Sequence, residues 1–329
     1  MRILLVGEYR YNMGPANVNK KIIEHMTGDF SYLKFQWPKG FDKILNVLEL
    51  LFKVCLSQVI IVSVTSRIGH IAGILCHLLH KDLVFIMHGC AEYEYKINGY
   101  GSKNGRKRQK YLMDHATLIL PVSNWYGEWL KDRYPNYKDR IGSWCLGFDP
   151  VECEKNTRRI KGFIMTAGGN DLRKNNYQLS DAVAGLNGKA RLEIYGVVNP
   201  ERPIKTNVNT TWMGLVPNDE FIRKLSSADI FVQNSTLESF DISLMEALYC
   251  GCNVLVSSNI GALDLVEVES TDIIADVNDV DEIRTKIEYL LEHPNNERIC
   301  AKINWEEISY ARAITRLREI CEAVYRNDK

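Results

Sequence analysis

The sequence lacks several features that would assign a protein to a particular class. It has 41 basic and 41 acidic residues, so no net charge draws it toward nucleic acid. No stretch reaches the roughly 20 apolar residues of a membrane-spanning helix, and the apolar run at the N-terminus is too short for a signal peptide. An apolar content of 46% and a charged content of 25% are ordinary for a folded chain. We therefore expect a water-soluble protein of the cytoplasm.

The cysteines and histidines also lack the spacing of known site types. Nine cysteines without a Cys-x-x-Cys pair are typical of buried thiols rather than of a disulfide framework. Only Cys250 and Cys252 are close, and one intervening residue suits neither zinc nor a redox pair. The seven histidines show no metal-ligand spacing, and no Gly-x-Gly-x-x-Gly follows an early strand, which disfavours a dinucleotide oxidoreductase. We expect neither a metal nor a cofactor.

Short apolar runs do alternate with helical patterns along the whole chain. This alternation predicts parallel sheets covered by helices. Because 329 residues are more than one core usually holds, we expect two doubly wound α/β domains. The polar run 151–161 separates them into 1–150 and 151–329, whose loops would face each other across a ligand-binding cleft. The expected strands are 2–6, 58–62, 83–87, 117–120, 162–166, 192–195, 230–233, 254–257 and 272–275.

Two glutamates in the second half lie where a strand passes through a loop into a helix. The pattern predicts a strand over 229–233 and an amphipathic helix over 242–249, so Glu238 lies on the loop and Glu246 on the helix. A helix start after a parallel strand offers unpaired N–H groups to an anion, and carboxylates accept hydrogen bonds from hydroxyls. Phosphate and hydroxyls together describe a nucleotide sugar, although carboxylates near helix starts are also common without any ligand.

The order of residue types around these glutamates resembles a known signature. Retaining family-4 glycosyltransferases of GT-B fold (glycosyl transferases group 1) carry Ser-x-x-Glu-x-Phe-Gly-x-x-x-x-Glu-Ala-x-x-x-Gly. The matching residues here are Ser235, Glu238, Phe240, Glu246, Ala247 and Gly251. The resemblance implies that Glu238 touches hydroxyls of the donor sugar and that Glu246 touches the ribose.

The same resemblance includes Phe240, Asp241 and Ile242 among the donor-binding residues. Asp241 stands where the family has glycine. Its side chain could cap the helix, but its carboxylate would repel a diphosphate.

A second segment, 168–175, resembles the family's Gly-Arg-x-x-x-Lys element, whose arginine and lysine bind the donor diphosphate. Lys174 matches the lysine, and a cation beside a helix start attracts oxyanions. The arginine position holds Gly169 or Asn170, so Arg173 is the candidate substitute, and Gly168 and Gly169 are assigned to donor binding. The alternative is a turn with solvated charges.

Glycines elsewhere resemble the family's nucleotide-contacting elements. The segments 192–196 and 212–214 resemble strands that end in glycine, and Gly196 would allow close approach of backbone to nucleotide. The segment 254–261 resembles the wall of the donor pocket. Gly14, in the loop after the first strand, would bring backbone N–H groups to the diphosphate, or it belongs to a plain strand-to-helix turn.

His88 directly follows a buried strand and precedes a glycine. The family has a His-Gly or His-Asp pair at the corresponding place, lining the reacting centre. The resemblance implies that His88 donates a hydrogen bond to the sugar or to the reaction intermediate and is not a metal ligand. A purely structural histidine is the alternative.

A basic run occupies a glycine-rich loop and helix start in the first half. It is either a solvated face or a contact for an anionic acceptor or membrane surface. Phe35, Trp37 and Phe41 would add apolar contact nearby or pack in the core. The basic residues are Lys103, Arg106, Lys107, Arg108 and Lys110.

The resemblance as a whole implies transfer of a hexosyl unit with retention of configuration and without a metal, with Glu238, His88 and Lys174 as catalytic residues. The donor would be a nucleoside diphosphate sugar, UDP-linked rather than GDP-linked. The acceptor would be a hydroxyl of a glycan or of a polyprenyl-diphosphate-linked sugar in bacterial surface polysaccharide synthesis, at the inner face of the membrane. The last helical stretch, 305–326, would cross back to the N-terminal domain.

Two other functions fit the same residues. A nucleotide-sugar epimerase on this scaffold would form product without an acceptor. A non-catalytic nucleotide-sugar-binding partner is suggested by the missing arginine and by Asp241.

Overall fold

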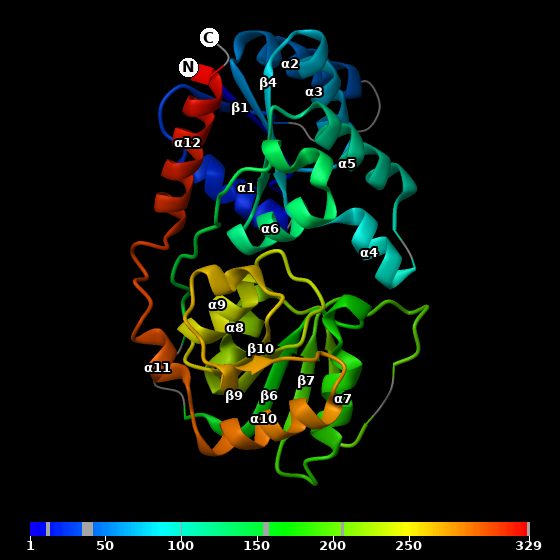
Figure 1. Ribbon diagram of the computed structural model, residues 1–329, viewed down its shortest axis with the longest axis vertical. Helices are drawn as coiled ribbons and strands as arrows, with labels where there is room; N and C mark the ends of the chain where they lie inside the picture. The colour runs from blue at the N-terminus through cyan, green and yellow to red at the C-terminus, as the bar shows by residue number, and fades with distance from the viewer. Residues whose placement is uncertain (11–13, 35–41, 100, 154–157, 205–206, 328–329) are drawn as a thin grey trace. The chain divides into compact units, whose positions relative to one another are not determined.

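The structure, a computed structural model, describes residues 1–10, 14–34, 42–99, 101–153, 158–204 and 207–327. The chain forms two compact units, each built on a parallel sheet with helices (Figure 1). Unit 1 comprises Met1–Gly147 and Glu306–Lys329, and unit 2 comprises Phe148–Trp305. The change of unit at 147/148 lies close to the boundary that the sequence predicts at 150.

The sheet of unit 1 has the strand order β2-β1-β3-β4-β5, with parallel pairing at each step. The side chains of β1, β3 and β4 are buried along their whole length, because helices cover both faces of the sheet. The strands predicted in this half are confirmed, and β2 is an additional one. The bounds are β1 (Ile3–Val6), β2 (Phe30–Tyr32), β3 (Val59–Val62), β4 (Asp82–Met87) and β5 (Leu118–Pro121).

The helices of unit 1 form two layers. In Figure 1, α2, α3 and α5 form one row, while α1 packs against α12. Serine side chains cap three of the helices, because the hydroxyls of Ser66, Ser102 and Ser123 accept hydrogen bonds from backbone N–H groups of the first turn. The bounds are α1 (Gly14–His25), α2 (Asp42–Leu56), α3 (Arg67–Leu78), α4 (Ala91–Asn98), α5 (Lys103–His115), α6 (Asn124–Arg133), η1 (Pro135–Arg140) and α12 (Tyr310–Asn327).

The sheet of unit 2 has the order β11-β10-β9-β6-β7-β8, again parallel. The strands predicted here are confirmed, although β11 is shorter than the predicted 272–275. Its strands are β6 (Ile160–Ala167), β7 (Arg191–Tyr195), β8 (Thr210–Gly214), β9 (Ala228–Gln233), β10 (Asn253–Ser257) and β11 (Ile273–Ile274).

Helices α7 and α10 of unit 2 pack together over a core that includes Ile164, Val183 and Ile287, whereas α8 packs against α9. Figure 1 shows these as two separate pairs beside the sheet. The bounds are η2 (Leu172–Lys174), α7 (Asn176–Ala184), α8 (Asn218–Ser227), α9 (Ile242–Tyr249), η3 (Gly261–Asp264), η4 (Ser270–Asp272), α10 (Val280–Glu292) and α11 (Asn296–Cys300).

The chain returns to unit 1 through its final helix. Helix α12 starts at Tyr310, later than the predicted 305, because residues 305–309 form turns. Ile314, Leu317 and Cys321 of α12 are buried, and the indole N–H of Trp144 donates to the carbonyl of Ala313 at 2.9 Å. The last helix is thus part of the core of unit 1.

Candidate functional site

The order of the strands in unit 2 brings two distant loops together. The chain runs from β6 outward to β7 and β8 and then resumes with β9 on the other side of β6. The loops that follow β6 and β9 therefore meet at the carboxyl edge of the sheet, which is where ligands bind in open α/β sheets. A hydrogen bond of 2.8 Å from the N–H of Thr236 to the carbonyl of Arg173 joins the two loops.

A cluster of charges lies where these loops meet. Glu238 Oε2 is 2.5 Å from Lys174 Nζ and 2.8 Å from an Arg173 guanidinium nitrogen. The exposed fractions of these three side chains are only 14%, 11% and 16%. Burial by itself would raise the pKa of Glu238, but the charges of Lys174 and Arg173 outweigh burial and lower the pKa. Glu238 is therefore ionised, and it forms an ion pair with each cation of the predicted phosphate contact.

The backbone of Glu238 is held by hydrogen bonds on both sides of the peptide. Its N–H donates to Asn259 at 2.8 Å, and its carbonyl accepts from the N–H of Gly261 at 2.9 Å. These bonds form a parallel bridge between Glu238 and Ile260, and the next link joins the N–H of Ala262 to Phe240 at 2.7 Å. The segment 254–261, predicted as a pocket wall, thus supports the Glu238 loop directly.

Asp241 caps α9, which is one of the two effects that the sequence suggests for it. Its Oδ1 accepts from the N–H of Leu244 at 3.3 Å, and its φ of +91° is a conformation in which glycine is favoured. The other carboxylate oxygen, Oδ2, is buried and has no hydrogen-bond partner among the described residues. Burial and the nearby charge of Glu238 raise the pKa of Asp241, and Lys174 opposes them.

Glu246 lies in the second turn of α9 and is almost completely buried. Burial raises its pKa to about 7, while a long hydrogen bond of 3.5 Å from Asn218 lowers it slightly. The two predicted glutamates therefore differ in charge state. Glu238 is held ionised by cations, whereas Glu246 titrates near neutrality because nothing comparable compensates its burial.

A cavity of about 150 Å³ lies beside α9 at the ends of β6, β7 and β8. It contains two of the predicted donor-binding glycines, Gly168 and Gly196, and also Ser243 at the start of α9. Sequence reasoning did not assign its other lining residues, among which only Tyr195 lies in a recognised segment, 192–196. These are Ala167, Tyr195, Leu215, Val216, Asn218 and Phe221.

Gly196 is required where the loops of β6 and β7 touch. Its φ is +122°, and a Cβ there would lie 2.7 Å from the backbone nitrogen of Gly169. The N–H groups of Gly168 and Gly169 both donate to the carbonyl of Tyr195 at 2.8 Å. Gly168, Gly169 and Gly196 thus form one backbone junction next to the cavity.

Phe240 and Ile242, both predicted to bind the donor, flank Asp241. The side chain of Phe240 is buried, and its carbonyl accepts the hydrogen bond from Ala262. Ile242 begins α9 and is partly exposed.

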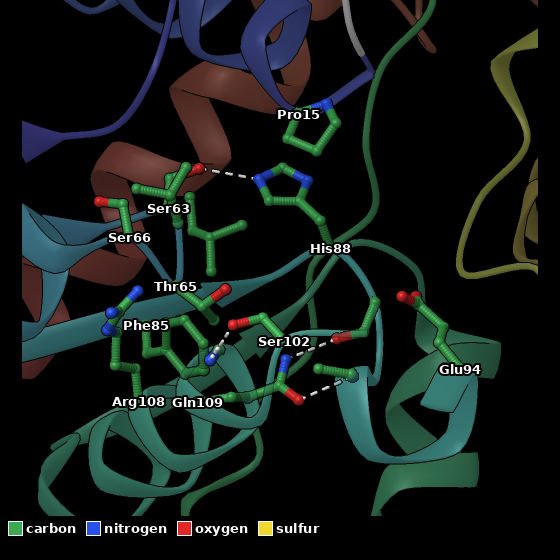
Figure 2. A pocket seen from close by; sticks show the side chains of 15 residues that line it. Pro15, Ser63, Thr65, Ser66, Phe85, His88, Glu94, Ser102, Arg108 and Gln109 are labelled. Carbon is green, nitrogen blue, oxygen red and sulfur yellow. Dashed lines mark hydrogen bonds between the residues drawn. The ribbon is translucent and has the colours of Figure 1, made fainter. Parts of the chain in front are cut away.

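His88 lies in unit 1, at the wall of a cavity of about 460 Å³. The cavity opens at the carboxyl ends of β3 and β4, and Figure 2 shows the imidazole ring between Ser63 and Pro15. Nε2 of His88 is 2.7 Å from the hydroxyl of Ser63. Burial lowers the pKa of His88 to about 4, so the ring is neutral at pH 7.

The loop that carries His88 is held by Gln109 of α5. The amide of Gln109 donates to the carbonyl of Gly89 at 2.8 Å and accepts from the N–H of Ala91 at 2.9 Å, as Figure 2 shows. Arg108, the neighbour of Gln109, lines the same cavity with Glu94 and Ser102. The cavity therefore combines a neutral histidine with both signs of charge and several hydroxyls.

The predicted basic residues divide between two places. Arg108 lines the cavity of His88, while Lys103, Arg106, Lys107 and Lys110 line a separate groove of about 630 Å³ with Tyr134 and Tyr137. The guanidinium of Arg106 lies over the ring of Tyr95, 3.5 Å from its centroid.

Gly14 is the first residue of α1, whereas the sequence predicts it in the loop before the helix. A Cβ at Gly14 would meet no atom within 4 Å, so no close backbone approach explains a glycine there. The predicted apolar contacts Phe35, Trp37 and Phe41 lie outside the described residues.

The described part of the chain contains no group of three or more His, Cys, Asp or Glu side chains that could hold a metal ion. None of its helices is both long enough and apolar enough to cross a bilayer.

Part of this chain is similar in sequence to known proteins. Residues 155–305, most of unit 2, match the family model described as glycosyl transferases group 1. O-antigen chain mannosyltransferase B of Escherichia coli is 26% identical over 230 residues, which are 63% of this chain and 58% of that protein. The chain thus matches only about three fifths of the length of this relative.

Solved structures resemble the whole chain. Anabaena HepE in complex with UDP-glucose superposes with a TM-score of 0.72 at 14% identity, over 98% of this chain and 100% of that one. The galactosyltransferase WaaB of the lipopolysaccharide outer core, in its apo form, gives a TM-score of 0.67 at 14% identity, over 98% and 99% of the two chains. The predicted α/β fold of GT-B class is confirmed, and residues 155–305 are similar to the glycosyl transferases group 1.

Proposed function

We propose that this protein transfers a hexosyl unit from a nucleoside diphosphate sugar to a hydroxyl acceptor, with retention of configuration and without a metal. The observation that carries the proposal is the contact of Glu238 with both Arg173 and Lys174 at the switch point of the sheet of unit 2, which is similar in sequence to the glycosyl transferases group 1 over residues 155–305. This site offers two cations for a diphosphate and a carboxylate for sugar hydroxyls within one hydrogen-bonded cluster.

Donor binding would exchange partners within this cluster. A diphosphate brings oxyanions to Lys174 and Arg173, so it takes over the ion pairs that Glu238 now forms with them. Glu238, released from the cations, would accept hydrogen bonds from hydroxyls of the sugar. Lys174 and the N-terminus of α9 would then stabilise the negative charge that develops on the leaving diphosphate.

The remaining donor contacts would come from around α9. Glu246 would accept hydrogen bonds from the ribose, and the backbone junction of Gly168, Gly169 and Gly196 would lie against the nucleotide. Asp241 would adjust the strength of binding, since its carboxylate repels a diphosphate but becomes neutral when it takes up a proton. We favour a UDP-linked donor, which is supported by the similarity to HepE, a structure solved with UDP-glucose.

Unit 1 would supply the acceptor and the remaining catalytic contact. A neutral His88 donates one hydrogen bond and accepts another, which suits contact with sugar hydroxyls. Gly14 would offer its backbone to the diphosphate, and no protein base is required if a diphosphate oxygen takes the proton of the acceptor.

Arg108 would hold an anionic group of the acceptor in the cavity of His88. Lys103, Arg106 and Lys107 would meet an anionic acceptor or the inner face of the membrane. We propose a glycan or polyprenyl-diphosphate-linked acceptor in bacterial surface polysaccharide synthesis, which the curated mannosyltransferase relative supports by its name.

The first test is ligand binding. Thermal-shift measurements with UDP, GDP and their hexose conjugates should show a rise in melting temperature for the true donor, because a ligand of the folded state stabilises it. The rise should disappear in Lys174→Met and persist in Lys189→Met, whose exposed lysine pairs with Glu288. An equal rise in both variants would contradict the assigned phosphate contact.

The second test is turnover. With the donor identified and a lipid-linked glycan as acceptor, Glu238→Ala should reduce kcat by about 100-fold or more, whereas Glu246→Ala should mainly weaken donor binding. Normal sugar transfer by both variants would refute the site. A changed sugar nucleotide in an incubation without acceptor would identify an epimerase instead.

A further inference from the structure

Helix α2 presents an apolar face to solvent. Ile44, Leu48 and Phe52, spaced by one turn each, are 56%, 55% and 65% exposed. Other exposed residues widen this stripe along the helix. They are Leu45, Leu51, Cys55 and Leu56, with Leu78 and Leu79 at the end of the neighbouring α3.

The opposite side of α2 already packs on the sheet, through the buried residues Asn46, Leu50 and Val54. The exposed stripe is therefore not the face that the fold needs for its own core. A helix that is apolar on both sides normally lies in a buried environment, and a contiguous exposed apolar patch marks an interaction surface.

Charged residues near the stripe form ion pairs and hydrogen bonds with one another and with the backbone. Lys53 Nζ is 2.7 Å from Glu49 and 2.6 Å from the carbonyl of Tyr32. Lys81, which follows α3, donates to the carbonyl of Cys55 at the end of the helix. Within α2, the exposed face carries one charge, that of Asp42 at the first position.

The composition of the stripe fits hydrocarbon better than a protein partner. Protein interfaces are enriched in Tyr, Trp, Met and Arg, and they carry hydrogen-bonding groups at regular intervals. The exposed face after Asp42 consists of Ile, Leu, Phe and Cys, which offer a partner little beyond apolar surface. Acyl chains demand no matching donor or acceptor, and Leu and Phe are typical of helices in a membrane interface.

The charge of the same helix layer fits anionic head groups. Helices α2, α3 and α5 lie in one row (Figure 1), and α5 exposes Lys103, Lys107 and Lys110. Lys110 pairs with Asp114, whereas Lys103 and Lys107 have no ion-pair partner among the described residues. Two exposed lysines without an ion pair among the described residues thus lie in the same layer of helices as the apolar stripe. Exposed lysines attract the negative surface of a membrane.

We infer that α2 lies in the interface of an anionic bilayer, with the stripe of Ile44, Leu48 and Phe52 among the acyl chains and the lysines of α5 at the head groups. This inference extends the contact proposed above for the basic residues, and it stands on the exposed face of α2 whatever the donor and the reaction are.

Vesicle binding tests the inference. The full chain should co-sediment with vesicles of phosphatidylcholine containing phosphatidylglycerol, and Leu48→Gln/Phe52→Gln should lower the partition coefficient by about tenfold or more, because two exposed apolar side chains lose their hydrocarbon contact. The matched control is Val208→Gln/Tyr289→Gln, which removes two exposed apolar side chains from unit 2 and should bind as wild type does.

Two further variants separate the apolar and the charged contribution. Lys103→Gln/Lys107→Gln should bind anionic vesicles as weakly as wild type binds pure phosphatidylcholine. Phe52→Trp should show a blue-shifted fluorescence emission with anionic vesicles, and it preserves the apolar character of the helix.

Several results would overturn the inference. One is wild-type protein that ignores both vesicle types, and another is equal binding by Leu48→Gln/Phe52→Gln and wild type. A third is a wild-type dimer that this variant converts to a monomer, since a second copy of the chain would then cover the face. Turnover with a water-soluble acceptor should be unchanged in Leu48→Gln/Phe52→Gln, so failure here is distinct from failure of the proposed reaction.

Discussion

Arg173, Lys174 and Glu238 form an almost fully buried group of charges, and their balance determines what the site can bind. Glu238 contacts both cations, while Asp171 lies 3.6 Å from Arg173 on its other side, so Lys174 and Arg173 share the carboxylate of Glu238. A diphosphate brings more negative charge to Lys174 and Arg173 than the single carboxylate of Glu238 does. The cluster therefore favours an anion over an empty site, provided that Glu238 can find other partners.

Replacing Glu238 with glutamine tests this balance through stability. Glu238→Gln leaves the buried Lys174 without its carboxylate and Arg173 with Asp171 alone, and it should lower the free energy of unfolding by about 3 kcal/mol. Excess UDP should restore more stability to this variant than it adds to wild type, because it compensates the same charges. Urea unfolding with and without UDP measures both effects.

Glu267→Gln is the control, because its exposed carboxylate pairs only with Lys302 in the described structure and its loss should change stability little. A Glu238→Gln variant as stable as wild type without UDP would show that the cluster is not held by this charge balance.

Glu246 gives the site a dependence on pH. Its pKa in the folded protein is about 7, above the 4.5 of a free glutamate, so the folded state binds an extra proton between these values. Stability contributed by this proton is fully present below pH 4.5 and is lost as the pH rises through 7. Glu246→Gln should therefore raise the free energy of unfolding at pH 8, by up to about 3 kcal/mol, and change it little at pH 4.5.

The measurement is urea unfolding at the two pH values. UDP affinity of the wild type should also fall as the pH drops below 7, because a protonated Glu246 loses the charge that strengthens its bonds to ribose hydroxyls. A gain in stability that is equal at both pH values would refute the assigned titration.

At the scale of single residues, the sequence predicts which helix, strand or loop carries a side chain. It does not predict which side chains from distant segments contact each other. It predicts that Glu238 lies on a loop and that Glu246 lies on a helix, and it gives a helix cap as one of two effects of Asp241, because these depend on local patterns. The contact of Arg173 with Glu238 joins residues 65 positions apart and depends on the tight turn of η2. Asn218, which bonds to Glu246, belongs to no recognised motif and was missed for that reason.

At the scale of elements, burial decides which strands the sequence reveals. The central strands β1, β3 and β4 are buried on both faces and read as unbroken apolar runs. β2 has only Phe30–Tyr32, partly exposed at the edge of the sheet, so its pattern is too short to recognise. The predicted start of the last helix was wrong because Trp305 packs on Phe148 and Tyr249, and α12 begins only after this cluster.

The junction of the β6 and β7 loops yields a prediction that uses two glycines as a matched pair. Gly196 and Gly214 both have a positive φ, but a Cβ at Gly196 meets the backbone of Gly169, whereas a Cβ at Gly214 meets nothing within 4 Å. Gly214→Ala should cost about 1 kcal/mol of stability, from backbone conformation alone. Gly196→Ala should cost about 3 kcal/mol, because the loops must also move apart.

Urea unfolding compares the two variants, and UDP titration should show weaker binding for Gly196→Ala only. Equal stability of the two variants would mean that the loops can separate freely, and the junction would then have no role in shaping the cavity.

At the scale of the whole molecule, the chain builds unit 1 from both of its ends. Met1–Gly147 and Glu306–Lys329 share one core, so this unit is complete only when the last helix has been added. Sequence pattern shows that a final helix exists, and only the family resemblance indicates that it crosses back to the N-terminal unit, where α12 packs on α1. Unit 2, by contrast, is one continuous segment, and it contains the motifs that the sequence reveals best.

Because α12 belongs to unit 1, a substitution that destabilises α12 should destabilise the unit formed by the N-terminal part of the chain. Leu317 is fully buried, so Leu317→Ala should lower the free energy of unfolding of unit 1 by about 3 kcal/mol, from lost apolar contact and the cavity left behind. Glu319→Ala changes an exposed residue of the same helix and should have little effect.

In calorimetry we expect separate transitions for the two units, since two-domain chains often depart from two-state unfolding. Leu317→Ala should lower one transition and leave unchanged the one that UDP raises. A fall in the UDP-sensitive transition itself would show that α12 stabilises unit 2 as well, and the division of the chain into two separately folding units would be wrong.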